Sequence, residues 1–123
     1  MSHIVQIQTQ VRDAEAVRAA CTRLGLPPPT VGSFQLFSEK VEGLAVQLPG
    51  WNYPAVCQLA SGQVKFDNFN GHWGSQLELD RFLQMYAVER ARIEARKKGY
   101  SVTEQPLGDG SIKLTVQVTG GAT

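Results

Sequence analysis

The feature that most constrains the fold is a series of four short segments in the middle of the chain, in which apolar and polar residues alternate. Alternation with a period of two is typical of a β-strand that buries one face. Turn formers at residues 42–43, 49–54 and 61–62 separate the segments, so hairpins are the shortest connections. We therefore predict a strand meander over residues 33–68. The apolar positions are Phe34 and Leu36; Leu44, Val46 and Leu48; Ala55, Cys57 and Leu59; and Val64 and Phe66.

A strand and a hairpin are predicted at the two ends of the sequence. In residues 3–9, apolar residues alternate with Gln6 and Gln8, which indicates a half-buried strand. In residues 100–118, two alternating arms flank a turn at 107–110, which favours a hairpin. The polar residues of the meander fall on the phase opposite to the apolar ones, so we expect the other face of the sheet to be solvated. They are Gln35, Gln47, Gln58, Gln63 and Lys65.

Two helices are predicted from their caps and their apolar spacing. The first covers residues 13–24, with Asp13 as its N-cap. The second covers residues 75–98 and starts at a capping box formed by Ser75 and Glu78. Large apolar residues at positions i, i+3, i+4 and i+7 of its first half predict the stripe that packs on the sheet. This stripe comprises Leu79, Phe82, Leu83 and Tyr86.

Together these elements predict an α+β fold, in which two helices pack on one face of a mostly antiparallel sheet. The chain has 123 residues, of which 42% are hydrophobic and 19% are charged, so it carries enough apolar material for one core. We expect a single domain over residues 1–123. The formal net charge of +1 argues against a dedicated DNA-binding module.

Several classes of site have no motif in the sequence. The apolar runs fall far short of the roughly 20 residues that a membrane span needs, and the first ten residues do not resemble a secretory signal, so we expect a cytoplasmic protein without membrane contact. No Cys or His spacing predicts a metal centre, and neither GxGxxG nor GxxxxGKS/T is present. We therefore predict no metal and no cofactor. Cys21 and Cys57 are expected to be reduced and buried.

Aromatic residues are concentrated in two predicted loops, over residues 49–54 and 67–74. Trp and Tyr are enriched where proteins contact one another. We predict that the two loops form one patch that binds a protein partner. The simpler alternative is that the rings cover the open end of the sheet. The candidate partner-binding residues are Trp51, Tyr53, Phe69, His72 and Trp73.

The end of the second helix offers an alternative function, as a small RNA-binding module. Five cations lie near Tyr100, an arrangement that suits contacts to RNA phosphates and stacking on a base. Glu89 and Glu94 interrupt the cluster, however, and favour a solvated helix end, so nucleic acid is not the expected partner. The cations are Arg90, Arg92, Arg96, Lys97 and Lys98.

An enzyme that uses Cys57 as nucleophile and His72 as base is a further alternative. Cys57 shares the strand phase of Ala55 and Leu59, which favours burial of the thiol instead. Homodimer formation is also predicted, through a polar sheet face. The residues of this face are Gln6, Gln8, Lys113, Thr115 and Gln117.

The order of features resembles a protein family. The opening SHIVQIQTQVRD, the segment RFLQMYAVERARIEARKKGY and the ending YSVTEQPLGDGSIKL are similar to domain of unknown function family twelve fifty-seven, which includes the hypothetical chloroplast reading frame thirty-five proteins of red-algal plastids and cyanobacteria. The resemblance covers residues 2–118. It implies the same fold and a cytoplasmic or stromal location, and it transfers no catalytic residue. Genes for a small ferredoxin and an ATPase often accompany bacterial members, which implies an accessory role beside an ATPase or ferredoxin-type partner.

No constellation that catalysis requires is present in the sequence. We therefore predict a non-enzymatic accessory or adaptor protein, which acts through protein contacts in a larger complex.

Overall fold

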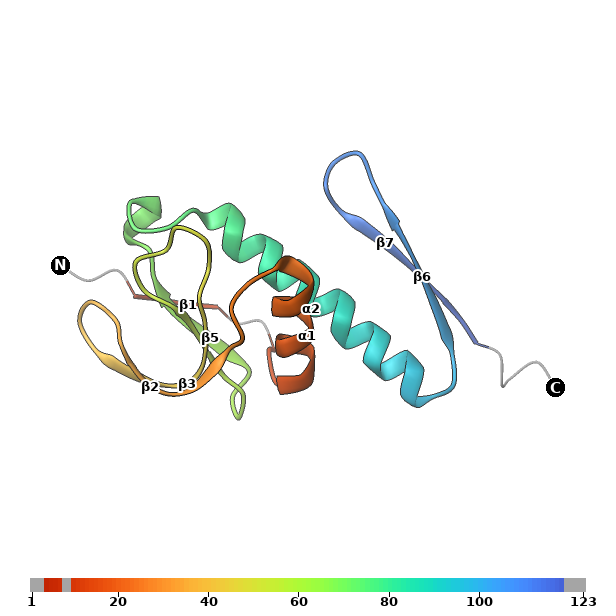
Figure 1. The fold of residues 1–123 in the computed structure, drawn as a ribbon, viewed down its shortest axis with the longest axis horizontal. Coiled ribbons are helices and arrows are strands. Elements are labelled where there is room, and N and C mark those ends of the chain that lie inside the picture. Colours follow the sequence, from red (N-terminus) through yellow and green to blue (C-terminus); the bar gives the residue numbers. More distant parts are fainter. Residues whose placement is uncertain (1–3, 8–9, 119–123) are drawn as a thin grey trace.

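The structure is a computed structural model, which describes residues 4–7 and 10–118 (Figure 1). In this part of the chain, five strands form one antiparallel sheet, two helices lie against it, and a hairpin forms a second sheet. The predicted α+β class is confirmed. The elements are β1 (Ile4–Ile7), α1 (Ala14–Leu24), β2 (Thr30–Gln35), β3 (Lys40–Val46), β4 (Ala55–Gln58), β5 (Gln63–Asp67), the 3-10 turn η1 (Phe69–Gly71), α2 (Gln76–Lys97), β6 (Ser101–Pro106) and β7 (Ile112–Gln117).

The five-stranded sheet has the order β1-β5-β4-β3-β2, and all neighbouring strands are antiparallel. Strands β2 to β5 follow one another as a meander, which begins at Thr30 rather than at residue 33. Because β1 pairs with β5, the two edges of the sheet are β1 and β2. Leu44, Cys57 and Val64 stand side by side on β3, β4 and β5, on the face that the helices cover.

The first helix, α1, is capped at both ends. The Asp13 carboxylate accepts hydrogen bonds from the N–H groups of Glu15 and Ala16, at 2.9 and 3.3 Å. These N–H groups have no partner inside the helix, so the bonds stabilise its first turn. Gly25 follows the last turn with a φ of +70°, which favours glycine, and ends the helix.

The second helix, α2, starts after Ser75, whose hydroxyl accepts a hydrogen bond from the N–H of Leu77 at 3.3 Å. The predicted capping box is not formed, because the Glu78 carboxylate pairs with Arg81 at 3.3 Å instead of turning back to Ser75. The predicted stripe faces the core: Leu79, Phe82 and Tyr86 are buried, and Leu83 is half-buried.

The main hydrophobic core lies between the covered face of the sheet and the two helices (Figure 1). Phe66 of β5 and Phe82 of α2 are its largest fully buried side chains. Burial of one such side chain contributes about 1.5–3 kcal/mol. Tyr86 lies in the same core, and its hydroxyl accepts hydrogen bonds from the N–H groups of Arg12 and Asp13, at 3.1 and 3.2 Å. These bonds tie the start of α1 to α2.

The opposite face of the sheet is only partly solvated, so the prediction from strand phase is wrong for this face. Gln47 is exposed and Lys65 is half-exposed, but Val56, which pairs with Lys65, is fully buried. The reason is that β3 and β4 carry apolar residues on both phases, and loop residues fold over the second set. The result is a second, smaller core of Leu36, Val41, Ala45 and Val56, with Phe34 and Tyr53 packed against it.

The C-terminal hairpin of β6 and β7 forms a sheet of its own rather than joining the main sheet. It lies along the second half of α2, away from the five-stranded sheet (Figure 1). Val102 and Leu114 are half-buried, and the register places them on one face of the hairpin. Two-stranded hairpins are marginally stable alone, so the contacts with α2 decide whether this one forms.

The polar residues predicted to share a dimer face do not lie on one sheet. Lys113, Thr115 and Gln117 are exposed on the outer face of the hairpin. Gln6 is in β1 of the main sheet, and Gln8 lies outside the described residues. Sequence phase assigns a residue to a face of its own strand, but it does not say which strands belong to the same sheet.

Candidate functional site

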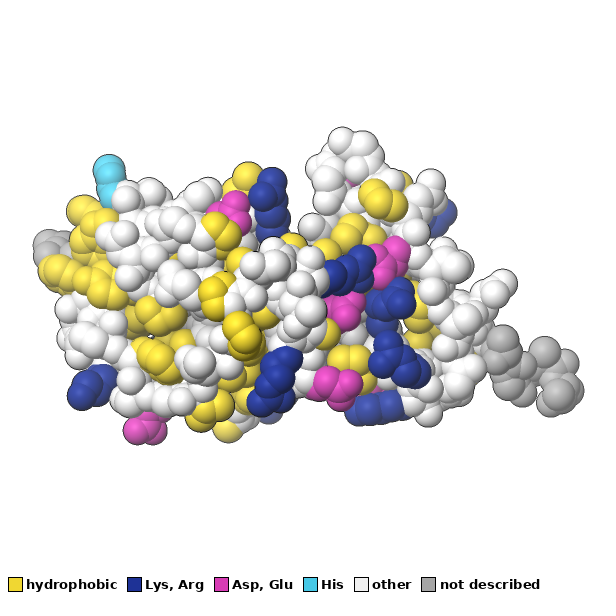
Figure 2. Space-filling model, viewed as in Figure 1, with side chains coloured by type: hydrophobic (Ala, Val, Ile, Leu, Met, Phe, Trp, Pro, Cys, Tyr) yellow, Lys and Arg dark blue, Asp and Glu magenta, His cyan; other side chains and the backbone are white. Residues whose placement is uncertain are grey.

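The two aromatic loops predicted from the sequence meet in the structure. The N–H of Asn52 donates a hydrogen bond to the carbonyl of Trp73 at 2.9 Å, which joins residues 49–54 to residues 67–74. In Figure 2, hydrophobic side chains gather at the end of the molecule that carries these loops. The five candidate residues nevertheless have different surroundings.

Trp51 belongs to the main core. Its side chain is 5% exposed, and its ring centroid lies 5.5 Å from that of Phe66, edge to face. The indole N–H donates a hydrogen bond to the carbonyl of Ser75 at 3.0 Å, which satisfies the polar atom of this buried ring. Trp51 therefore fits the alternative prediction, in which the aromatic rings cover the open end of the sheet.

The other candidates form a half-exposed cluster around Trp73. The centroid of the Trp73 ring lies 4.8 Å from that of Phe69, 5.2 Å from Phe37 and 5.7 Å from Tyr53. Phe69 also contacts His72, at 4.9 Å between centroids. Tyr53, Phe69 and Trp73 are half-buried, whereas His72 is exposed. We refer to Phe37, Tyr53, Phe69, His72 and Trp73 as the aromatic surface.

The loop that carries the aromatic surface has a strained backbone. Phe69 and Asn70 have φ of +45° and +52°, in the left-handed region that bulky side chains rarely adopt. The loop is held in place by Asn68, whose side-chain amide donates to the carbonyl of Gly74 at 3.2 Å, and by the carboxylate of the buried Asp67, which accepts from the N–H of Phe69 at 3.2 Å. Such strain persists only where surrounding contacts enforce it, and it is concentrated at functional sites.

Phe37 was not identified from the sequence. It follows the apolar Leu36 directly, so it breaks the alternation of the strand, and it lies in the turn between β2 and β3. The side chain is 46% exposed. The sequence signal that could have identified Phe37 is the presence of a large apolar residue beside the polar residues of a short turn.

The basic end of α2 is partly neutralised. Arg90 pairs with Glu94 one turn further along the helix, and Arg92 pairs with Glu104 of β6 at 2.7 Å. The remaining cations, Arg96, Lys97 and Lys98, are exposed and form no ion pair within the described part of the chain. Tyr100 is half-buried and lines a shallow hollow of about 290 Å³.

An ion-pair junction joins α1, α2 and the hairpin. Arg23 of α1 pairs with Glu89 of α2 at 2.9 Å and also with Glu104 of β6, which in turn accepts from Arg92. Hydrogen bonding to Arg23 lowers the pKa of the Glu104 carboxyl and outweighs the opposing effect of burial. Figure 2 shows the acidic and basic side chains intermingled where the hairpin meets the rest of the molecule. The sequence did not reveal this role of Arg23.

Cys57 and His72 do not share an environment. Cys57 is fully buried in the main core, and His72 is exposed beside Phe69. Burial raises the pKa of the Cys57 thiol to about 12, and Cys21 adds to the shift. At neutral pH the nucleophilic thiolate is therefore scarce.

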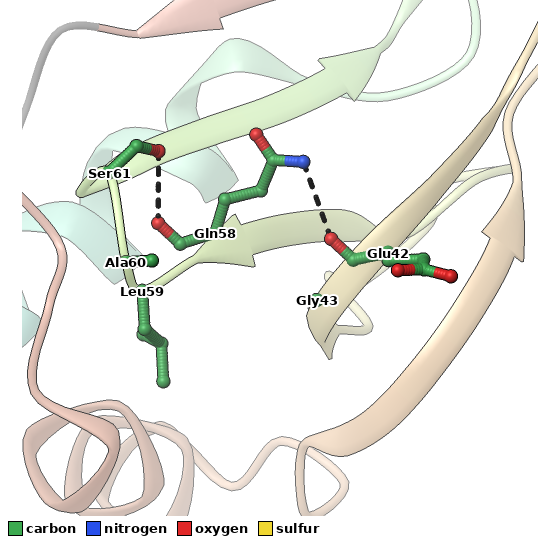
Figure 3. Close-up of a pocket in the computed structure, with 6 residues that line it drawn as sticks. All are labelled: Glu42, Gly43, Gln58, Leu59, Ala60 and Ser61. Carbon is green, nitrogen blue, oxygen red and sulfur yellow. Dashed lines mark hydrogen bonds between the residues drawn. The ribbon is translucent and has the colours of Figure 1, made fainter.

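A surface hollow of about 430 Å³ lies where β3 and β4 approach the turn before β5 (Figure 3). The Gln58 amide donates to the carbonyl of Glu42 at 3.3 Å, and the Ser61 hydroxyl donates to the carbonyl of Gln58 at 3.2 Å. The Glu42 carboxylate points away from both side chains (Figure 3). The polar groups of the hollow therefore bond to the backbone beside them rather than converge on one point.

Residues 4–7 and 10–118 contain neither a metal-binding cluster nor a membrane-spanning helix. No group of three His, Cys, Asp or Glu side chains is arranged to hold a metal ion there. In the same residues, neither helix combines the length and the apolar character needed to cross a bilayer.

Comparison with known proteins gives one informative match. The chain is 31% identical over 128 residues to an uncharacterised protein, ycf35, of Pyropia yezoensis. The similarity spans 95% of this chain and 97% of that protein. No family model and no solved structure matches the chain. The predicted resemblance to the chloroplast reading frame proteins is therefore supported by this relative, and the numbered domain family is not. With this identity over nearly the whole of both proteins, the chain belongs to the ycf35 family.

Proposed function

We propose that this chain is a non-enzymatic accessory protein, which binds a protein partner through the aromatic surface. The observation that carries the proposal is the half-exposed Trp73, which three other aromatic rings surround within 5.7 Å. Large aromatic side chains that are ordered before binding lose little conformational entropy on contact, and they dominate the energy of protein interfaces.

The strained loop supports the same proposal. Phe69 adopts its left-handed conformation at a cost of about 1–3 kcal/mol, whereas asparagine, at position 70, tolerates it more readily. The rings of this loop lie outside the main core, to which Trp51 and Phe66 belong. In this proposal, the strained loop presents Trp73 and Phe69 in the orientation in which the partner covers them.

The test is capture of partners from native cell extract by tagged protein. Wild type is compared with Trp73→Ala and Phe37→Ala, and with Leu77→Ala as matched control, because Leu77 is 55% exposed on α2 outside the aromatic surface. We expect a stoichiometric protein to be retained by wild type and by the control and lost from both surface variants. ATPase and ferredoxin-type proteins, the partners that the resemblance implies, are the first candidates. Unchanged capture by folded Trp73→Ala, with folding checked by circular dichroism, contradicts the proposal.

RNA binding is the second candidate, and the exposed Arg96, Lys97 and Lys98 favour it. Contacts of three cations with phosphates predict that the logarithm of affinity falls with the logarithm of salt concentration with a slope of about −2. Titration of fluorescent single-stranded RNA at low ionic strength tests this for wild type and for Lys97→Ala/Lys98→Ala. Lys40→Ala, an exposed cation on β3, is the control. Absence of salt-dependent binding excludes this function.

A further inference from the structure

The edge strand β2 leaves one side of its backbone without a partner strand. In the described part of the chain, Thr30–Gln35 pairs with β3 alone, and no other segment lies along the outer side. Four of its six residues are exposed. The N–H and C=O groups on an open edge are a ready template for another strand in extended conformation.

The sequence of β2 lacks the devices that usually protect an edge. Its six residues, Thr-Val-Gly-Ser-Phe-Gln, include no charged residue and no proline. The hairpin is protected, since β6 carries Glu104 and Pro106 and β7 carries Lys113. At the other edge of the main sheet, the part of β1 that the structure describes is four residues long, and short edge strands resist pairing.

An exposed valine marks the same edge. Val31 is 78% exposed, although its register partner Leu44 is 2% exposed in the main core. Val31 thus shares the covered face of the sheet with Leu44, but it lies exposed at the edge of that face. A strand added beside β2 shields this side chain from water.

The strand that fits is β2 of a second copy of the chain. An antiparallel pair related by a two-fold axis uses the same residues on both sides, and self-complementary interfaces of this kind are the commonest in homodimers. The formal net charge of +1 gives two copies almost no mutual repulsion. An uncharged edge on a nearly neutral chain thus suits another copy better than a strongly charged partner.

We propose that two copies of this protein pair through antiparallel β2 strands and form one continuous ten-stranded sheet. The interface consists of backbone hydrogen bonds along β2 and of contacts between Val31 of one copy and Ser33 of the other, on both sides of a two-fold axis at Gly32. The proposal is independent of the aromatic surface, because it concerns self-association of the pure protein and not capture of another one.

Sedimentation equilibrium of the full chain, from about 1 to about 300 µM, measures the association. We expect a species of twice the 13.5 kDa chain mass. Val31→Lys/Ser33→Lys and Val31→Glu/Ser33→Glu place like charges across the interface, so each should weaken dimerisation about tenfold or more. Mixing the two variants should restore a dimer, because opposite charges then face each other. Thr22→Lys/Thr115→Lys, at exposed positions of α1 and of the hairpin, is the control and should dimerise like wild type.

Three results overturn the proposal. The first is a wild-type chain that stays monomeric at every concentration. The second is a lysine variant that dimerises as strongly as wild type. The third is a mixture of the lysine and glutamate variants that stays monomeric although each variant has a native circular dichroism spectrum.

Discussion

Gly74 places the indole of Trp51, and with it the loop that leads into α2. A Cβ atom at position 74 would lie 2.4 Å from Cδ2 of the Trp51 ring, far inside normal contact. The absence of a side chain there lets the ring pack against the loop backbone and donate its N–H to Ser75. The burial of Trp51 therefore requires glycine at position 74.

Gly74→Ala should destabilise the protein by about 1–3 kcal/mol, because the ring or the loop has to move to admit the methyl group. Urea unfolding followed by tryptophan fluorescence measures the change. Gly108→Ala is the matched control, since a Cβ atom there meets nothing within 4 Å, and it should change stability by less than about 0.5 kcal/mol. Equal stability of the two variants would show that Trp51 does not pack against Gly74 as described.

The buried thiols predict that the protein loses stability in alkaline solution. Burial raises the pKa of Cys57 from 9.0 to about 12 and that of Cys21 to about 11. The unfolded chain releases these protons near pH 9 while the folded chain keeps them. Stability is therefore fully present below about pH 9 and falls above it, by up to about 1.4 kcal/mol per pH unit for each thiol.

Urea unfolding at about pH 8 and about pH 10.5 tests this expectation on wild type and Cys57→Ala. The alanine variant loses packing at both pH values, so the comparison concerns only the difference between them. We expect a smaller loss for Cys57→Ala, because ionisation of the other groups is common to both proteins. An identical loss would assign the alkaline destabilisation to groups other than Cys57.

Glu104 makes the ion pairs that join the hairpin to both helices, and Gln84 of α2 adds a hydrogen bond to the carbonyl of Gly110 at 3.2 Å. Glu104 of β6 receives hydrogen bonds from Arg23 of α1 and from Arg92 of α2. The apolar contribution is limited, because Val116 on the same face remains 43% exposed. The hairpin is therefore weakly buried, and ion pairs contribute much of its stabilisation against the helices.

Glu104→Gln should increase opening of the hairpin without unfolding the main core. We expect amide hydrogen exchange in β6 and β7 to become about three- to tenfold faster, with β3 and β4 unchanged. Glu94→Gln is the control, because it breaks only the pair with Arg90 within α2. Faster exchange throughout the protein would contradict an effect confined to the hairpin.

The same junction predicts a response of the hairpin to acid. Because the pKa of Glu104 is lowered, its contribution is present above the ordinary carboxyl range and is lost as pH falls through the lowered pKa. Hairpin exchange, compared with β3 at each pH, should therefore accelerate at acidic pH in wild type and less in Glu104→Gln. A ratio that does not change with pH in wild type would exclude this role for the carboxylate.

The whole molecule has two parts that share α2. The first half of the helix contributes Leu79 and Phe82 to the main core, and the second half supports the hairpin. The second half also contributes Ile93 to the main core and buries Val88, so the helix is packed along most of its length.

Phe82→Ala and Leu114→Ala should separate these two parts. Loss of the fully buried Phe82 ring should cost about 3–5 kcal/mol of a total that is typically 5–15 kcal/mol, and should lower the global urea midpoint sharply. Leu114 is half-buried on the hairpin, so its replacement should shift the global midpoint little and accelerate exchange mainly in β6 and β7. Equal shifts of the global midpoint would mean that core and hairpin unfold as one unit.

Patterns within a few residues were sufficient to predict much of this fold. Asp13 and Ser75 were readable as helix caps, and the strand phase of Cys57 correctly indicated a buried thiol. Such signals are local, because caps, turns and alternation depend on neighbours one to four positions away. The same locality explains the failures. Phase could not show that the hairpin forms a sheet of its own or that apolar residues on the second face of β3 and β4 are covered.

The candidate site depended on contacts between segments that are distant in sequence. Trp51 and Trp73 are both loop aromatics in the sequence, and they separate into core and surface because the loop at 67–74 closes over Trp51 and leaves Trp73 half-exposed. Arg23 reaches Glu104 across 81 positions. These contacts depend on how the sheet and the helices pack against one another in three dimensions. No periodicity along the chain determines that packing.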